Sequence, residues 1–154
     1  MGNPRFRRRG VRRGTVRSDG YRSAFEAKVA KDLTDRGVQF DYESVEYKLQ
    51  VPGTPGHQCM ECGEKRIVRL TKYTPDFQIA GGKLIVETKG RFTGKDRKVA
   101  LAFIAQYPRN YKLLFMRDNT LSKASDTKYS DWCAKNGIEC AVGASVPAEW
   151  LGGV

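Results

Sequence analysis

The stretch "YTPDFQIAGGKLIVETKG", residues 73–90, constrains the fold more than any other part of the sequence. Two apolar segments, "DFQIA" and "KLIVET", flank a pair of glycines, and short apolar segments joined by a glycine turn are typical of a β-hairpin. Asp76 opens the first segment, whereas Glu87 and Lys89 close the second. We therefore predict a central hairpin with three charged groups gathered at one end of its strands.

The remaining patterns predict an α/β domain in which helices flank a mixed central sheet. Apolar side chains recur at helical spacing over 23–37, where Ser23 and Glu26 have the spacing of a capping box at the helix start. Alternating apolar residues predict a strand over 38–51. The chain of 154 residues suits one domain of this kind. Further elements are predicted as strands at 66–70, 111–117 and 138–142 and as helices at 94–107 and around 129–137.

Positive charge is concentrated at the start of the chain. The formal net charge is +11, and residues 1–17 contain seven arginines and no acid. We predict a basic, flexible arm over 1–20 ahead of a domain over 21–154. Such an arm gains affinity for phosphates by releasing counterions, which favours nucleic acid, with a solvated tail and an anionic membrane surface as alternatives. The predicted DNA contacts are Arg7, Arg8, Arg9, Arg12 and Arg13 of the arm, with Arg97 and Lys98 at the start of the helix over 94–107.

The sequence predicts an intracellular protein with reduced thiols and no contact with a membrane. It has no apolar run long enough to span a bilayer, no leader-like segment and only four cysteines. In the predicted loop over 52–66, Cys59 and Cys62 have the spacing of half a zinc site. Because a full site needs four ligands, and Cys133 and Cys140 fit buried positions, a ligand-free turn or a redox pair is favoured over structural Zn²⁺.

Asp76, Glu87 and Lys89 are the residue types that hydrolysis of a phosphodiester requires. Residues two apart in a strand share a face, so Glu87 and Lys89 point the same way, and Asp76 on the adjoining strand can reach them. Carboxylate oxygens suit Mg²⁺ or Mn²⁺, and an ammonium can orient or deprotonate the attacking water or neutralise the phosphate. The alternative is an ordinary surface ion pair worth under about 1 kcal/mol.

A family resemblance supports the nuclease interpretation. "PDF", followed after ten residues by "ETK", resembles the motif of the PD-(D/E)xK nuclease superfamily. The chain also resembles the endonuclease I family of Holliday-junction resolvases from T-seven-like phages, from about Tyr21 to Leu151. The motifs that carry this resemblance are "YRSAFEAKVAKDLTDRGVQFDYE", "YTPDF", "VETKG", "KDRK", "WCAKNGI" and "PAEW".

The resemblance implies a catalytic set of Glu26, Asp76, Glu87 and Lys89. It implies that Asp76, Glu87 and the backbone carbonyl of Thr88 hold one Mg²⁺ or Mn²⁺, and that Glu26 and Asp76 serve a second where two are bound. The pattern of the sequence itself assigns Glu26 to the capping box with Ser23. These two roles are alternatives, because a carboxylate turned to its own helix start is turned away from a metal.

The resemblance further implies a restriction-endonuclease-like fold in a domain-swapped homodimer. The bridge lies near "ESVEYKLQV", and Glu26 comes from one subunit while Asp76, Glu87 and Lys89 come from the other. The expected function is metal-dependent resolution of four-way junctions and other branched DNA by paired cuts, without a small-molecule cofactor. The alternatives are a superfamily nuclease that cuts ordinary duplex DNA and a non-catalytic basic DNA-binding module.

Overall fold

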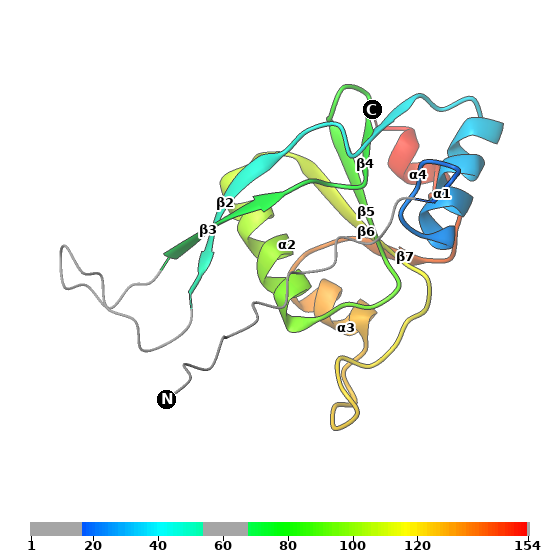
Figure 1. Ribbon diagram of the computed structural model, residues 1–154. Coiled ribbons are helices and arrows are strands. Elements are labelled where there is room, and N and C mark those ends of the chain that lie inside the picture. Colours follow the sequence, from blue (N-terminus) through cyan, green and yellow to red (C-terminus); the bar gives the residue numbers. More distant parts are fainter. Residues whose placement is uncertain (1–16, 54–67, 154) are drawn as a thin grey trace, which may run out of the picture.

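The computed structural model describes residues 17–53 and 68–153 (Figure 1). Several predicted residues lie outside the described ranges. They are the predicted DNA contacts of the N-terminal arm, Arg7, Arg8, Arg9, Arg12 and Arg13, together with Cys59 and Cys62. The helices are α1 (Ala24–Asp35), α2 (Gly94–Gln106), α3 (Tyr129–Lys135) and α4 (Ala148–Leu151). The strands are β1 (Phe40–Tyr42), β2 (Tyr47–Pro52), β3 (Val68–Tyr73), β4 (Phe77–Ile79), β5 (Leu84–Lys89), β6 (Asn110–Phe115) and β7 (Cys140–Val142).

A five-stranded sheet in the order β1-β4-β5-β6-β7 forms the centre of the molecule. β1, β4 and β5 pair antiparallel, whereas β5, β6 and β7 pair parallel. The crossover from β5 to β6 is made by α2, because parallel neighbours need a connection long enough to return across the sheet. The predicted α/β domain with a mixed central sheet is confirmed.

The central hairpin is also confirmed. β4 pairs with β5 through Phe77 opposite Val86, so the start of β4 lies beside the end of β5. Gly81 and Gly82 lie in the turn at φ values of 66° and 83°, a backbone conformation that residues with a Cβ rarely adopt. A Cβ added at Gly82 would also lie 3.0 Å from the side chain of Gln78.

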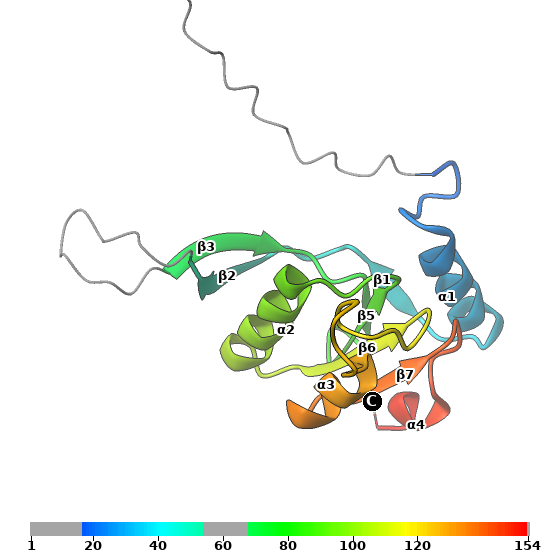
Figure 2. The ribbon, with the colours of Figure 1, turned by 90° about the horizontal axis from the view of Figure 1, so that it is seen from below.

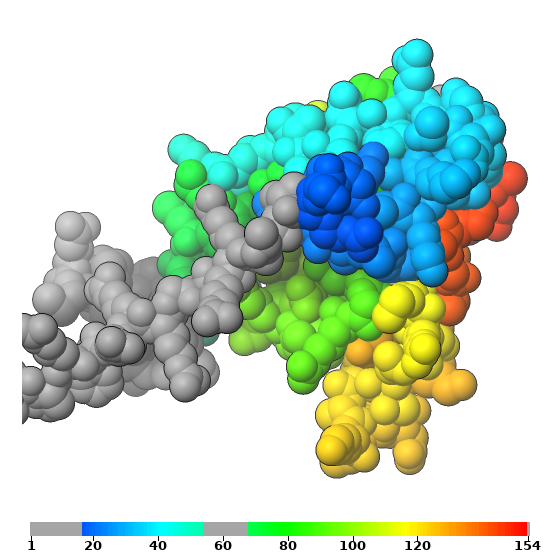
Figure 3. Space-filling view, turned by 45° about the vertical axis from the view of Figure 1, so that its right-hand side comes forward, coloured from blue at the N-terminus to red at the C-terminus, as the bar shows by residue number. Residues whose placement is uncertain are grey.

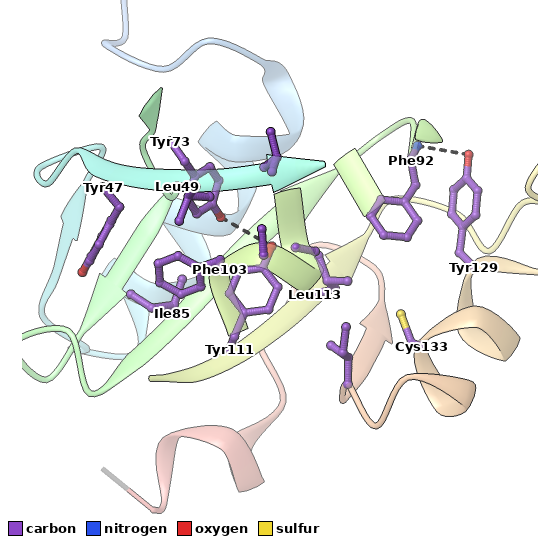
Figure 4. Packing of buried hydrophobic residues seen from close by; sticks show 14 of the residues in the cluster. Tyr47, Leu49, Tyr73, Ile85, Phe92, Phe103, Tyr111, Leu113, Tyr129 and Cys133 are labelled. Carbon is purple, nitrogen blue, oxygen red and sulfur yellow. Dashed lines mark hydrogen bonds between the residues drawn. The ribbon is translucent and has the colours of Figure 1, made fainter. Parts of the chain in front are cut away.

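Helices lie on both faces of the sheet (Figure 2), and a hydrophobic cluster fills the space between the helices and the sheet on each face. On one face, α2 and α3 pack against β2 and the sheet around Ile85, Phe103 and Leu113, and Figure 4 shows this layer from close by. On the other face, α1 and α4 pack around Leu114 and Phe77. Strands β4 and β5 are therefore buried on both sides, which explains their nearly continuous apolar sequence.

The predicted strand over 38–51 is two strands in different sheets. β1 joins the central sheet beside β4, whereas β2 pairs with β3 in a separate antiparallel ribbon that packs against α2. The chain bends between them at Glu43, whose φ of 45° lies in the left-handed region. The alternation in the sequence shifts phase between Tyr42 and Val45, and this shift is the signal of the bend.

The N-terminus of α1 differs in detail from the predicted capping box. Ser23 is the N-cap, and its Oγ accepts from Glu26 N at 3.1 Å, as predicted. The Glu26 carboxylate accepts from Ser23 Oγ at 2.7 Å and from Arg22 N at 3.3 Å, instead of from the backbone N–H of Ser23. The cap therefore holds Glu26 on the residues just before the helix.

The C-terminal end of α1 is fastened to the segment before α4. Asp32 Oδ2 accepts from Val146 N at 3.1 Å, and Arg36 Nη1 donates to the carbonyl of Val146 at 2.6 Å. Figure 3 shows the helix lying against this C-terminal segment. Among the described helices, none is both long and apolar enough to cross a membrane.

Candidate active site

The candidate site lies where β4 begins and β5 ends, and two hydrogen bonds join these points. Asp76 Oδ2 accepts from Thr88 N at 2.8 Å and from Thr88 Oγ1 at 2.6 Å. Thr88 faces the α1 side of the sheet, whereas its neighbours Glu87 and Lys89 face the α2 side. Asp76 nevertheless lines one pocket with Glu87 and Lys89, and its backbone N–H donates to Glu87 Oε2 at 3.2 Å.

Glu87 is a buried carboxylate with a partner for each oxygen. Its side chain is 4% exposed, and Oε1 lies 2.8 Å from Lys89 Nζ. Oε2 accepts from Tyr73 OH at 2.8 Å and from Asp76 N at 3.2 Å. These contacts fix the carboxylate beside Asp76, so the two acids and the lysine form one unit.

Two buried tyrosines, Tyr73 and Tyr111, form a hydrogen-bonded pair next to Glu87. The hydroxyls of Tyr73 and Tyr111 lie 3.4 Å apart, and Figure 4 shows the two side chains meeting across the core. Burial, followed by the negative charge of Glu87, raises the pKa of both phenols well above the usual range. Both therefore stay neutral, and the Tyr73 hydroxyl donates to Glu87.

Lys89 is held in its charged form. Burial by itself would lower the pKa of Lys89, but the charge of Glu87, followed by that of Asp96 at 3.4 Å, outweighs burial and raises it. Asp96 belongs to the capping box that starts α2 with Thr93 as N-cap. The ammonium of Lys89 therefore sits between a strand carboxylate and a helix-capping carboxylate.

Asp76 is the group that this arrangement leaves least satisfied. Burial raises its pKa well above the usual range and the charge of Glu87 adds to the shift, while the Thr88 hydrogen bonds and Lys89 oppose it. Both Thr88 bonds go to Oδ2, so among the described residues Oδ1 receives no hydrogen bond. Two desolvated carboxylates with one ammonium are short of positive charge, and a hard divalent cation fits such a donor set.

The site opens into a pocket of about 280 Å³. Four cationic side chains line it together with the acids, so its wall can neutralise an anionic ligand. The charged residues of the lining are Arg22, Glu43, Lys72, Asp76, Glu87, Lys89, Lys95 and Asp96.

Glu43 is a carboxylate of this pocket that no motif in the sequence indicates as a site residue. Its N–H donates to the carbonyl of Asp76 at 2.9 Å, and its Oε1 lies 2.9 Å from Arg22 Nε. Burial raises the pKa of Glu43, Arg22 opposes the shift, and the negative charges of Glu26 and Glu87 add to it. The bend with left-handed backbone at Glu43 therefore brings a further acid into the pocket of Asp76, Glu87 and Asp96.

Glu26 lies near the site but does not line the pocket. Its carboxylate is occupied by Ser23, Arg22 N and the hydroxyl of Tyr42. Across residues 17–53 and 68–153, no three His, Cys, Asp or Glu side chains come close enough together to form a metal cluster. The structure thus brings Asp76, Glu87 and Lys89 together and leaves Glu26 on its helix cap.

The two predicted DNA contacts on α2 take different positions. The guanidinium of Arg97 donates to the carbonyl of Phe92 at 3.0 Å and lies over the Phe92 ring, so it braces the loop before α2. Lys98 instead lines a second pocket together with Arg69 and Lys95.

Asp76→Asn is expected to stabilise the protein at neutral pH when a chelator removes divalent cations. The unfolded chain ionises Asp76 near pH 3.9, whereas the fold raises its pKa, so ionisation costs stability progressively as the pH rises above about 4. Urea denaturation at a series of pH values should therefore show an advantage of the variant that grows with pH.

Asp126→Asn is the matched control. Because Asp126 is exposed, this variant should gain no stability over wild type as the pH rises. A difference between Asp76→Asn and wild type that stays constant from pH 4 to neutral pH would contradict the raised pKa.

The chain is similar to known phage endonucleases. Residues 64–153 match the phage endonuclease I family. The chain is 33% identical over 141 residues to Endonuclease I of Escherichia phage T7. The matched region covers 90% of this chain and 83% of that protein. It is 34% identical over 120 residues to Endodeoxyribonuclease 1 of Enterobacteria phage T3, covering 77% of this chain and 68% of that protein.

The family expected from the sequence motifs is thus confirmed, together with the endonuclease activity that it implied. With its two carboxylates and a lysine at the end of a buried hairpin, the chain belongs to the phage endonuclease I family and is a DNA-cleaving enzyme.

Proposed function

We propose that this enzyme is a divalent-metal-dependent, structure-selective endonuclease that resolves four-way junctions and other branched DNA by paired hydrolysis of phosphodiesters. The observation that carries the proposal is the unit of Asp76, Glu87 and Lys89 in a pocket whose wall also holds cations. This unit supplies the oxygen ligands and the counter-charge that phosphodiester hydrolysis requires.

Asp76, Glu87 and the carbonyl of Thr88 are the proposed ligands of one Mg²⁺ or Mn²⁺. Two carboxylates and a carbonyl suffice, because Mg²⁺ keeps several of its waters and is usually held by one or two carboxylates. When bound, the cation lowers the pKa of a water and stabilises negative charge on the phosphate. Asp76 lines the pocket, and its Oδ1, which accepts no hydrogen bond from the described residues, is the oxygen proposed to bind the cation.

Lys89 acts in this proposal as a cation and not as a proton acceptor. Glu87 and Asp96 keep it protonated, so it cannot readily take a proton from water. A fixed ammonium at this position stabilises the negative charge that the phosphate gains in the transition state. Of the roles left open by the sequence, neutralising the phosphate and orienting the water fit the structure.

Lys89→Ala is expected to lower the cleavage rate by about 100-fold or more while junction binding stays within about tenfold, because the lost charge serves the transition state. The substrates are a four-way junction and a linear duplex of matched sequence, each with Mg²⁺ and with chelator. We expect paired cuts in the junction alone, dependent on Mg²⁺.

Lys83→Ala is the control lysine, because Lys83 precedes β5 and thus lies at the opposite end of that strand from Lys89. It should cut like wild type. Equal cutting of junction and duplex would reject junction selectivity, and undiminished cutting by Lys89→Ala would reject the role of Lys89.

The second part of the proposal is a homodimer in which α1 and β1 are exchanged between subunits. Within one chain, β1 pairs with β4, and Glu43 N–H bonds the carbonyl of Asp76. A swapped dimer would make these same contacts between chains, with residues 43–46 as the bridge between β1 and β2. Glu26 would then approach the Asp76 site of the partner subunit.

A mixed dimer of Glu26→Ala and Lys89→Ala subunits is expected to regain strand cleavage. In a swapped dimer, one site receives both defects and the other receives none, so the mixed dimer cuts one strand of each junction. In an unswapped dimer, each site keeps one defect and both stay inactive.

The mixed dimer is prepared by co-expression with two affinity tags, and nicking is compared with that of each parent homodimer. A mixed dimer no more active than its parents would reject the exchange, provided that the Glu26→Ala homodimer is itself defective.

A further inference from the structure

A groove of about 300 Å³ lies between the β2–β3 ribbon and the start of α2. Figures 1 and 2 show these elements side by side. Arg69 of β3 forms one wall, and Lys95 and Lys98 of α2 form the other, while the end of β2 at Pro52 and Gly53 adds an uncharged surface. The charged lining is entirely positive, in contrast to the mixed charges of the catalytic pocket.

This groove continues the catalytic pocket. Lys95 and Val99 line both hollows, so the two share one wall on successive turns of α2. Lys95 comes one residue before Asp96, which pairs with Lys89. A chain of phosphates that enters the site at Lys89 can therefore pass directly along the groove.

The three cations of the groove are available for a ligand. In the part of the chain that the structure describes, Arg69, Lys95 and Lys98 form no ion pair, and all three are exposed. The neighbouring Arg97 is used internally on Phe92. The positive end of the α2 dipole adds to the favourable potential for anions.

We propose that this groove holds backbone phosphates of the cleaved strand on one side of the scissile phosphate. The proposal deepens the proposed function, because it rests on cleavage at Asp76, Glu87 and Lys89. Lysine and arginine contacts to phosphates fix the position of a strand without reading its bases. Arg69 and Lys98 thus set how the strand is aligned at the carboxylates, independently of sequence.

The test compares two double variants that remove the same charge. Arg69→Ala with Lys98→Ala changes the groove, whereas Lys83→Ala with Arg109→Ala changes two exposed cations at the opposite end of the sheet, before β5 and β6. Affinity for a four-way junction and for a linear duplex is measured in chelator over a range of salt concentrations. Thermal unfolding verifies that both variants are folded.

The groove variant is expected to lower the slope of log affinity against log salt by about 1 for each lost contact, or about 2 in all, on either DNA. The control is expected to keep the wild-type slope. A groove variant with the wild-type slope would overturn the proposal.

A second readout locates the phosphates. Neutral methylphosphonates are placed singly on each side of the mapped cut, and wild type and control should lose affinity at one or two positions on one side only. The groove variant should lose this sensitivity, and an unchanged positional profile would overturn the proposal.

The outcome is separable from that of the proposed function. A wild-type protein that cuts duplex as well as junction rejects junction selectivity and leaves the groove result intact. A groove variant that behaves like its control rejects the groove and leaves the cleavage results intact.

Discussion

The pair of hydrogen bonds from Thr88 to Asp76 is the contact on which the rest of the site depends. It joins the start of β4 to the end of β5, and the ladder between these strands places Glu87 and Lys89 on the opposite face. The bonds also hold Asp76 Oδ2 on Thr88, while Asp76 itself lines the pocket. A hairpin that is buried on both faces gives this contact a rigid base, because neither strand can shift without disrupting a hydrophobic layer.

The same arrangement lowers the stability of the folded protein when no cation is bound at the site. Burial raises the pKa of Asp76 and Glu43, and in each case the charge of Glu87 adds to the shift. Four acids therefore share the pocket, and Asp76 is the one that no salt bridge joins to a cation among the described residues. Groups with perturbed pKa values in a cleft are typical of functional sites, where binding of a ligand supplies the missing charge. The cost in stability is consistent with a site selected for cation binding and catalysis.

Local patterns predicted the elements that carry the site, because each is determined by neighbouring residues. The hairpin follows from two apolar segments around Gly81 and Gly82, and α2 follows from helical spacing that ends before Pro108. Contacts between distant segments were not predictable in this way. The role of Glu43 depends on its meeting Asp76 and Arg22 across the fold, and that of Arg97 depends on its meeting the Phe92 ring. The assignment of Glu26 to a metal came only from family resemblance, whereas its cap contacts follow the local pattern with Ser23.

We propose that Asp76 and Glu87 hold a divalent cation beside Lys89. The most direct measurement is the anomalous diffraction of crystals grown with Mn²⁺ and collected near the manganese absorption edge. We expect an anomalous peak in contact with oxygens of Asp76 and Glu87 and with the carbonyl of Thr88. Crystals that show Mn²⁺ bound elsewhere, with the Asp76 and Glu87 oxygens free of metal, would contradict it.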